Sequence, residues 1–176
     1  GLDKVRGLVY KKNGLPTNGA PGEIVQTEDM DRVMPGYAWD LLPKDKYFLD
    51  KYRAHYWHNY FKDDGRTPFA AISTSLGCSF GCNFCMINIV NRTSFDPAVA
   101  SDSRGMRFWS PELMLKEFEY LYENGVRTVR LTDEMFFLNR KYYIPILEGI
   151  KQRGMKFNFW AYARVDSVRK DQLELF

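Results

Sequence analysis

The residues with the clearest chemical potential are the three cysteines, which all lie within the eight residues from 78 to 85. Cys78, Cys82 and Cys85 have the spacing C-x3-C-x2-C. Three thiolates this close in sequence can reach one metal centre together. A structural zinc site usually takes four protein ligands, and an ordinary four-iron cluster takes four thiolates. A four-iron cluster held by only three thiolates would keep one iron free to bind another ligand.

Three other interpretations of these cysteines stay open. They can be buried free thiols that pack as small hydrophobic groups, although their confinement to one short segment argues against it. They can hold zinc together with His55 or His58, but both histidines lie in an aromatic-rich segment where a packed or exposed imidazole is more ordinary. A thioredoxin-like redox pair is a weak alternative, because that motif needs its own fold context.

The composition is that of an ordinary globular protein, with 176 residues, 45% hydrophobic and 27% charged. A net charge of +3, from 25 basic and 22 acidic residues, is too small to indicate a nucleic-acid or anionic-membrane partner. We find no apolar run of the ~18 residues that a membrane span needs, and no signal-peptide pattern. Three clustered cysteines without a secretion signal fit a reducing compartment, so we expect a cytoplasmic protein.

The chain divides into an N-terminal segment, residues 1–64, and a core, residues 65–176. Lys12-Asn-Gly14 predicts a hairpin turn near the start. Residues 37–61 carry nine aromatic residues, which we interpret as a linker whose rings pack on a neighbouring domain. Residues 91–107 read as a long polar loop.

The core alternates strands with helices. We expect strands over residues 68–75, 126–132 and 155–163, and helices over 110–125 and 139–154, with another helix starting at 167. Ser110 and Pro111 are typical of a helix start, and Asn139 can cap the next helix. This order predicts an α/β fold with parallel strands and right-handed crossovers.

The cysteine pattern resembles the signature of the radical S-adenosylmethionine (SAM) family, C-x3-C-x-aromatic-C, with Phe84 in the aromatic position. The resemblance implies an open parallel (β/α) barrel with the cluster loop after the first strand. This chain would supply the first three βα units of that partial barrel, preceded by the irregular aromatic-rich linker. A full eight-fold barrel takes ~250 residues, so the chain looks like a fragment.

The same resemblance implies the chemistry. A 4Fe-4S cluster on three cysteines would bind SAM and cleave it reductively to methionine and a 5′-deoxyadenosyl radical, which abstracts hydrogen from a small-molecule or still unknown substrate. An electron donor such as flavodoxin or ferredoxin would reduce the cluster.

The resemblance also implies candidate residues for SAM binding. Asp133 and Glu134 follow the second predicted strand, where the family binds the methionine amino group, and we favour Glu134. Arg164, after the third strand, can meet the methionine carboxylate, although an Arg–Asp surface pair with Asp166 would look the same in the sequence.

The segment before the core resembles the linker of the cobalamin-binding subgroup, on Gly7-Leu-Val-Tyr10 and on residues 37–43. Methylation of an unactivated carbon or ring formation is the usual chemistry there. No cobalamin domain fits in these residues, so cobalamin is expected only in a full-length parent. The competing hypothesis is a non-catalytic iron–sulfur or zinc-binding module.

Overall fold

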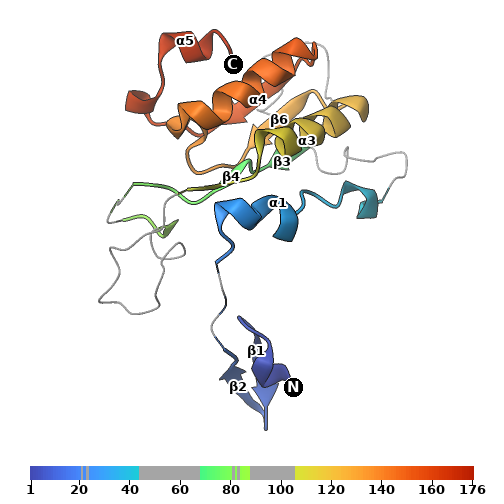
Figure 1. The fold of residues 1–176 in the computed structure, drawn as a ribbon, viewed down its shortest axis with the longest axis vertical. Helices are drawn as coiled ribbons and strands as arrows, with labels where there is room; N and C mark the ends of the chain where they lie inside the picture. The colour runs from blue at the N-terminus through green and yellow to red at the C-terminus, as the bar shows by residue number, and fades with distance from the viewer. Residues whose placement is uncertain (21, 23, 44–67, 81, 83, 88–105) are drawn as a thin grey trace.

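The structure of the chain is a computed structural model that describes residues 1–20, 22, 24–43, 68–80, 82, 84–87 and 106–176. The helices are α1 (Met30–Val33), α3 (Pro111–Glu123), α4 (Arg140–Gln152) and α5 (Lys170–Leu173). The strands are β1 (Val9–Lys12), β2 (Leu15–Asn18), β3 (Phe69–Ile72), β4 (Ser75–Leu76), β5 (Arg107–Phe108), β6 (Thr128–Leu131) and β7 (Asn158–Ala161). In Figure 1, α3 and α4 lie side by side, and the β1–β2 pair lies at the far end of the molecule.

The predicted hairpin is the antiparallel pair of β1 and β2. Its two turn residues, Asn13 and Gly14, have φ angles of 53° and 84°. Positive φ at both central residues is what a two-residue turn needs to match the twist of the strands, and asparagine and glycine reach it at low cost.

The sheet that carries the core has the order β3-β6-β7, with both neighbouring pairs parallel. Along the chain, α3 lies between β3 and β6, and α4 lies between β6 and β7. Four side chains on one face of the first two strands are no more than 2% exposed: Ala70, Ile72, Val129 and Leu131. They pack in the same core as the apolar sides of α3 and α4. The predicted α/β class with a parallel sheet is confirmed.

Helix α3 begins and ends as its sequence predicts. The side-chain oxygen of Ser110 accepts a hydrogen bond from the backbone N–H of Leu113 at 3.1 Å, and Pro111 is the first helical residue. Gly125 ends the helix with φ of 83°. Its apolar side is buried at Met114, Phe118 and Leu121.

Helix α4 differs from its prediction at the cap. Asn139 occupies the N-cap position, but its side chain makes no cap hydrogen bond. Its backbone carbonyl instead accepts from the N–H groups of Tyr142 and Tyr143, at 2.9 and 3.1 Å. Pro145 lies inside the helix, in its second turn.

Three predicted elements differ in extent. The strand expected over residues 68–75 is split into β3 and β4. Arg107, expected in a loop, belongs to β5, which pairs antiparallel with β4. The third core strand is only Asn158–Ala161, because Met155 still bonds back to the carbonyl of Ile150 at the end of α4.

The segment before the core is held against α3 by a buried carboxylate. Glu117 accepts from the backbone N–H of Tyr37 at 3.2 Å and from the indole N–H of Trp39 at 2.5 Å. Asp31 accepts from the N–H of Ser110 at 2.8 Å, at the start of the same helix. These two rings therefore pack on the core, whereas the division of the chain into a linker and a core domain stays a prediction. The other seven aromatics of the linker lie in residues 44–67, outside the described part of the chain.

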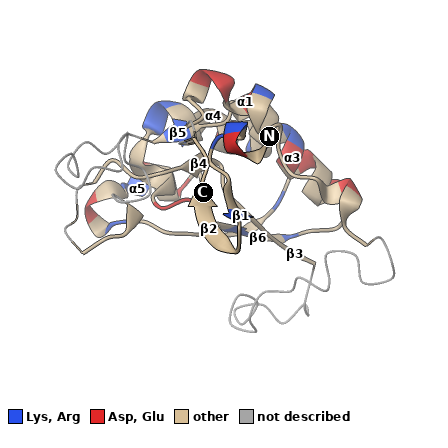
Figure 2. Cartoon of the chain, turned by 90° about the horizontal axis from the view of Figure 1, so that it is seen from below, with Lys and Arg blue, Asp and Glu red and all other residues tan. Residues whose placement is uncertain are grey.

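The charged residues do not form one broad patch of a single sign on the described ribbon. Figure 2 shows basic and acidic residues interspersed along the helices. Across the described residues, we find no helix that combines the length and apolar character needed to cross a membrane.

Candidate active site

The three cysteines lie on the loop that follows β4, at the carboxyl end of the parallel sheet. All three are free thiols; Cys78 is buried, and Cys82 and Cys85 are partly exposed. The N–H of Cys85 donates to the carbonyl of Cys82 at 3.1 Å, so the last two cysteines share one turn. Active sites of parallel barrels gather at this edge of the sheet.

The chemistry of this donor set fits an iron–sulfur cluster with one open iron, because three thiols on one loop bring soft ligands together. Within the described residues, however, no three His, Cys, Asp or Glu side chains converge closely enough to hold a metal ion. Ligation of a cluster by Cys78, Cys82 and Cys85 therefore stays a prediction. The zinc alternative with His55 or His58 lies outside the described residues.

Asp133 is buried at the base of this loop, with 1% of its surface exposed. Its carboxylate accepts from the backbone N–H of Thr74 at 3.1 Å, from the Thr74 hydroxyl at 2.7 Å and from the Ser75 hydroxyl at 2.6 Å. Burial raises the pKa of Asp133, and the hydrogen bonds from Ser75 and Thr74 partly offset this rise. The carboxylate thus joins the end of β6 to the residues that lead into the cysteine loop.

Two tyrosines complete the connection between β3 and β4. The hydroxyl of Tyr142, on α4, donates to the carbonyl of Thr74 at 2.6 Å. The hydroxyl of Tyr37 contacts Ser73 twice, donating to its carbonyl at 3.0 Å and accepting from its N–H at 2.5 Å. Burial raises the pKa of both phenols, so they stay neutral donors at physiological pH. Backbone groups that leave the sheet at this point are therefore satisfied by side chains.

Glu134 differs from Asp133 in its surroundings, because its side chain is exposed. Strand β6 ends at Leu131, before both acids. The carboxylate of Asp133 is already engaged by hydroxyl and N–H donors, whereas that of Glu134 is accessible to a ligand. This contrast agrees with our preference for Glu134 as the group that binds an ammonium, which stays a prediction.

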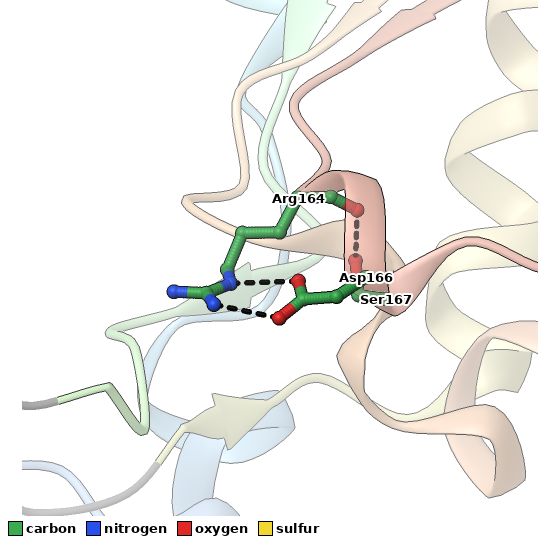
Figure 3. Close-up of polar contacts among 3 residues, drawn as sticks. All are labelled: Arg164, Asp166 and Ser167. Atoms are coloured by element: carbon green, nitrogen blue, oxygen red, sulfur yellow. Dashed lines mark hydrogen bonds and ion pairs between the residues drawn. The ribbon is translucent and has the colours of Figure 1, made fainter.

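Arg164 follows β7 and lies beside the cysteine loop. Its guanidinium is 4.3 Å from the centre of the Phe80 ring. Figure 3 shows the fork-like pair that it forms with Asp166, with N–O distances of 2.9 and 2.7 Å. The hydrogen bond and the charge of Asp166 are the main causes of the raised pKa of Arg164, and the nearby Cys82 and Cys78 are minor contributors in the same direction.

The structure therefore contains the Arg–Asp pair that the sequence left open, and it also brings the same arginine close to two cysteines. Phe84, the aromatic residue of the motif, is 93% exposed. Its ring is accessible to a cofactor, and a role of Phe84 in cofactor binding stays a prediction.

A comparison with protein-family models matches residues 72–169 to the radical SAM superfamily. The chain belongs to the radical SAM superfamily. The matched region includes the cysteine loop, both acids after β6 and Arg164, so all candidate residues lie inside the family domain.

Two known proteins are similar to this radical SAM chain. An uncharacterized methyltransferase, PH0819 of Pyrococcus horikoshii, is 32% identical over 170 residues, which are 96% of this chain and 31% of that protein. The fold resembles that of OxsB, described as a cobalamin-dependent SAM radical enzyme. The TM-score is 0.52 and the identity 21%, over 98% of this chain and 21% of OxsB. The chain therefore spans about a third or less of each protein's length.

Sequence reasoning missed the partners that surround Asp133. Its hydrogen-bond donors, Thr74 and Ser75, are ordinary residues in the sequence and lie 59 and 58 residues before it. One signal was present, since Asp133 has the same parity along the strand as the buried Val129 and Leu131. The same parity predicts that Asp133 points toward the buried core. A buried carboxylate normally needs hydrogen-bond donors around it.

Proposed function

We propose that this chain is the catalytic core of a radical SAM enzyme that generates a 5′-deoxyadenosyl radical. In this proposal, Cys78, Cys82 and Cys85 hold a 4Fe-4S cluster. When bound, the cluster supplies the electron that cleaves SAM into methionine and the radical. The observation that carries the proposal is the family signature C-x3-C-x-F-C on a loop at the carboxyl edge of a parallel sheet, inside a region that matches the family.

The chain's own residues would bind and orient SAM. Glu134 is exposed beside the site and can accept hydrogen bonds from the amino group of the methionine part. Arg164 lies near the cysteines and can pair with the carboxylate of the same part if it exchanges Asp166 for that ligand. A guanidinium suits this role because its fork-like donors match a carboxylate. The exposed ring of Phe84 would contact the same ligand.

The proposed architecture is the first half of a radical SAM barrel. Strands β3, β6 and β7, with the helices that follow them, would be its first three βα units, in residues 65–176. Residues 1–64 would be a linker from a preceding domain. The parallel strand order and the packing of Tyr37 and Trp39 on the core support this division.

Cobalamin-dependent methyl transfer is a second, more specific proposal. The relative named as a methyltransferase and the fold of OxsB, titled as cobalamin-dependent, support it. Cobalamin would bind in a part of the protein outside these 176 residues, and the substrate would be a small molecule. A flavodoxin or ferredoxin would be the electron donor, in a reducing compartment such as the cytoplasm.

Anaerobic reconstitution tests the proposal against its alternative. With the protein at its full natural length, we expect about four irons per chain and reductant-dependent release of 5′-deoxyadenosine and methionine from SAM. One tightly held zinc per chain, without SAM cleavage, would identify a zinc-binding module instead. An intact cluster that never cleaves SAM would point to a non-catalytic iron–sulfur protein.

A further inference from the structure

The parallel sheet has two faces, and only one of them is covered by α3 and α4. Paired residues of neighbouring strands point to the same side. Ala71, Arg130 and Trp160 are paired in register across the three strands. The residues next to them along each strand, such as Val129 and Leu131, are buried toward the helices. Phe159 contacts the ring of Phe118 on α3, which places Trp160 on the opposite face.

Arg130 lies on the central strand of this second face, beside two neighbouring aromatic rings whose centres are 5.9 Å apart. Its guanidinium carbon is 5.2 Å from the centre of the Trp160 ring and 5.4 Å from that of Tyr162. One terminal nitrogen donates to the Tyr162 hydroxyl. The Nε atom is shielded from solvent and has no hydrogen-bond partner. A guanidinium with an unused, shielded donor has capacity to bind a further acceptor.

Within the part of the chain that the structure describes, no carboxylate balances this positive charge. Among the described residues, the ion pairs involve other cations, and every interaction of Arg130 is with an aromatic residue. Arg153 and Arg164, in contrast, are each paired with an acid. Arginines that are partly buried are normally paired, so the missing partner of Arg130 indicates that a negative ligand can take its place.

The surroundings of Arg130 change along the strands. Phe69 and Thr128 lie on the same face, two residues before Ala71 and Arg130 on their strands. They are 9% and 5% exposed, so this end of the face is closed to solvent. Beside Arg130 on the neighbouring strand, Ala71 is exposed and has only a methyl side chain. Two residues after Ala71 and Arg130, the hydroxyls of Ser73 and Thr132 lie 2.7 Å apart, at the edge of the sheet that leads into the cysteine loop.

We propose that Arg130, with Trp160 and Tyr162, forms a binding site for an oxyanion, a carboxylate or a phosphate, attached to an aromatic or similarly planar group of the substrate. The guanidinium would bind the oxyanion through its free donors, and the rings and the space over Ala71 would receive the planar group. The oxyanion binding stands on this geometry alone. Only the statement that its ligand is the substrate of SAM-dependent chemistry rests on the proposed function.

The test measures binding of two probes, benzoate and phenyl phosphate, to the full-length protein by ligand-observed NMR titration, with neutral benzamide as the comparison. We expect Arg130→Gln to weaken binding of both anions by about tenfold or more, since a charge-assisted hydrogen bond is lost. Arg130→Lys should lose less affinity than Arg130→Gln because it keeps the positive charge. It should still bind less tightly than wild type, since it lacks the paired planar donors of the guanidinium. Lys116→Gln, which removes an exposed charge on α3, should leave binding unchanged.

Three results would overturn the proposal. The first is that wild type binds the anions no better than benzamide. The second is that Arg130→Gln and Arg130→Lys both bind the anions as wild type does. The third is that Arg130→Gln loses affinity for SAM and not for the probes, because the oxyanion would then be the carboxylate of SAM.

The probe titrations need no cluster. A protein that does not cleave SAM but binds the anions through Arg130 would therefore refute the proposed function and leave this inference standing. If Arg130→Gln does not fold, the lysine variant decides.

Discussion

At the scale of single residues, the two neighbouring acids after β6 occupy very different environments. Asp133 is enclosed and accepts hydrogen bonds from Thr74 and Ser75, whereas Glu134 is exposed. One acid therefore serves the fold, while the other is accessible to a ligand. Substitutions at these two positions should therefore have different effects on ligand binding.

Replacing Glu134 by glutamine should weaken equilibrium binding of SAM to the reconstituted protein. The loss of a charge-assisted hydrogen bond to an ammonium costs about 1.5–3 kcal/mol, or roughly tenfold to 150-fold in affinity. Asp133→Asn is the matched variant, and its effect on SAM affinity should be smaller. The opposite order of effects, measured by isothermal titration, would show that Asp133 is the ligand. Equal and negligible effects would remove this acidic pair from the site.

The cysteines should behave as one unit. Changing Cys78, Cys82 or Cys85 to alanine should each abolish stable loading of four irons, since two thiolates would have to hold the cluster. Iron analysis and the visible absorption of the cluster measure this after anaerobic reconstitution. Ser79→Ala, an exposed neighbour in the same loop, should load like wild type. A cysteine variant with full iron content would refute the assignment.

At the scale of elements, the important feature is the junction where β3 gives way to β4. Its residues 73–75 are held by β6 through Asp133, by α4 through Tyr142 and by the N-terminal segment through Tyr37. Three separate elements thus fix the backbone that leads into the cysteine loop. A site that must hold a cofactor in one geometry benefits from such support.

This junction should give the protein a pH-dependent stability. Because burial raises the folded-state pKa of Asp133 above 3.8, its contribution to the free energy of unfolding is fully present below that value. The contribution is lost as the pH rises through the raised pKa. The stability of wild type relative to Asp133→Asn should therefore decrease as the pH rises from about 4 to about 8. Urea unfolding at several pH values measures it, and a relative stability that increases over that range would contradict the prediction.

At the scale of the whole molecule, the N-terminal segment and the core are connected through Glu117. This acid is 8% exposed and receives the N–H of Tyr37 and the indole of Trp39. Gly36 lies so close that a Cβ there would be 2.1 Å from a Glu117 oxygen, and its φ of 100° also favours glycine. The segment that precedes the core is therefore fitted closely to α3.

Glu117→Ala should leave two donors without a partner and destabilise the protein by about 1–3 kcal/mol. Glu119→Ala, on the same helix but with a half-exposed side chain, is the control and should cost much less. Thermal unfolding measures both, and limited proteolysis should show earlier cleavage near residues 37–42 in the first variant only. Equal stability of the two variants would show that this contact contributes little.

The features determined by sequence alone are those encoded within a few neighbouring residues. They include the C-x3-C-x-F-C motif, the Asn13-Gly14 turn, the Ser110 cap and the alternation of strands and helices. Each depends on local backbone preference or on spacing, which no distant residue has to supply.

The tertiary structure alone decided which distant groups meet. Thr74 and Asp133 are 59 residues apart, and Trp39 and Glu117 are 78 apart. Whether such groups meet depends on strand register and helix packing, because a shift of one residue reverses the side of every side chain. For that reason, the sequence favoured Glu134 only through the family resemblance, and the fold buried Asp133 and exposed Glu134.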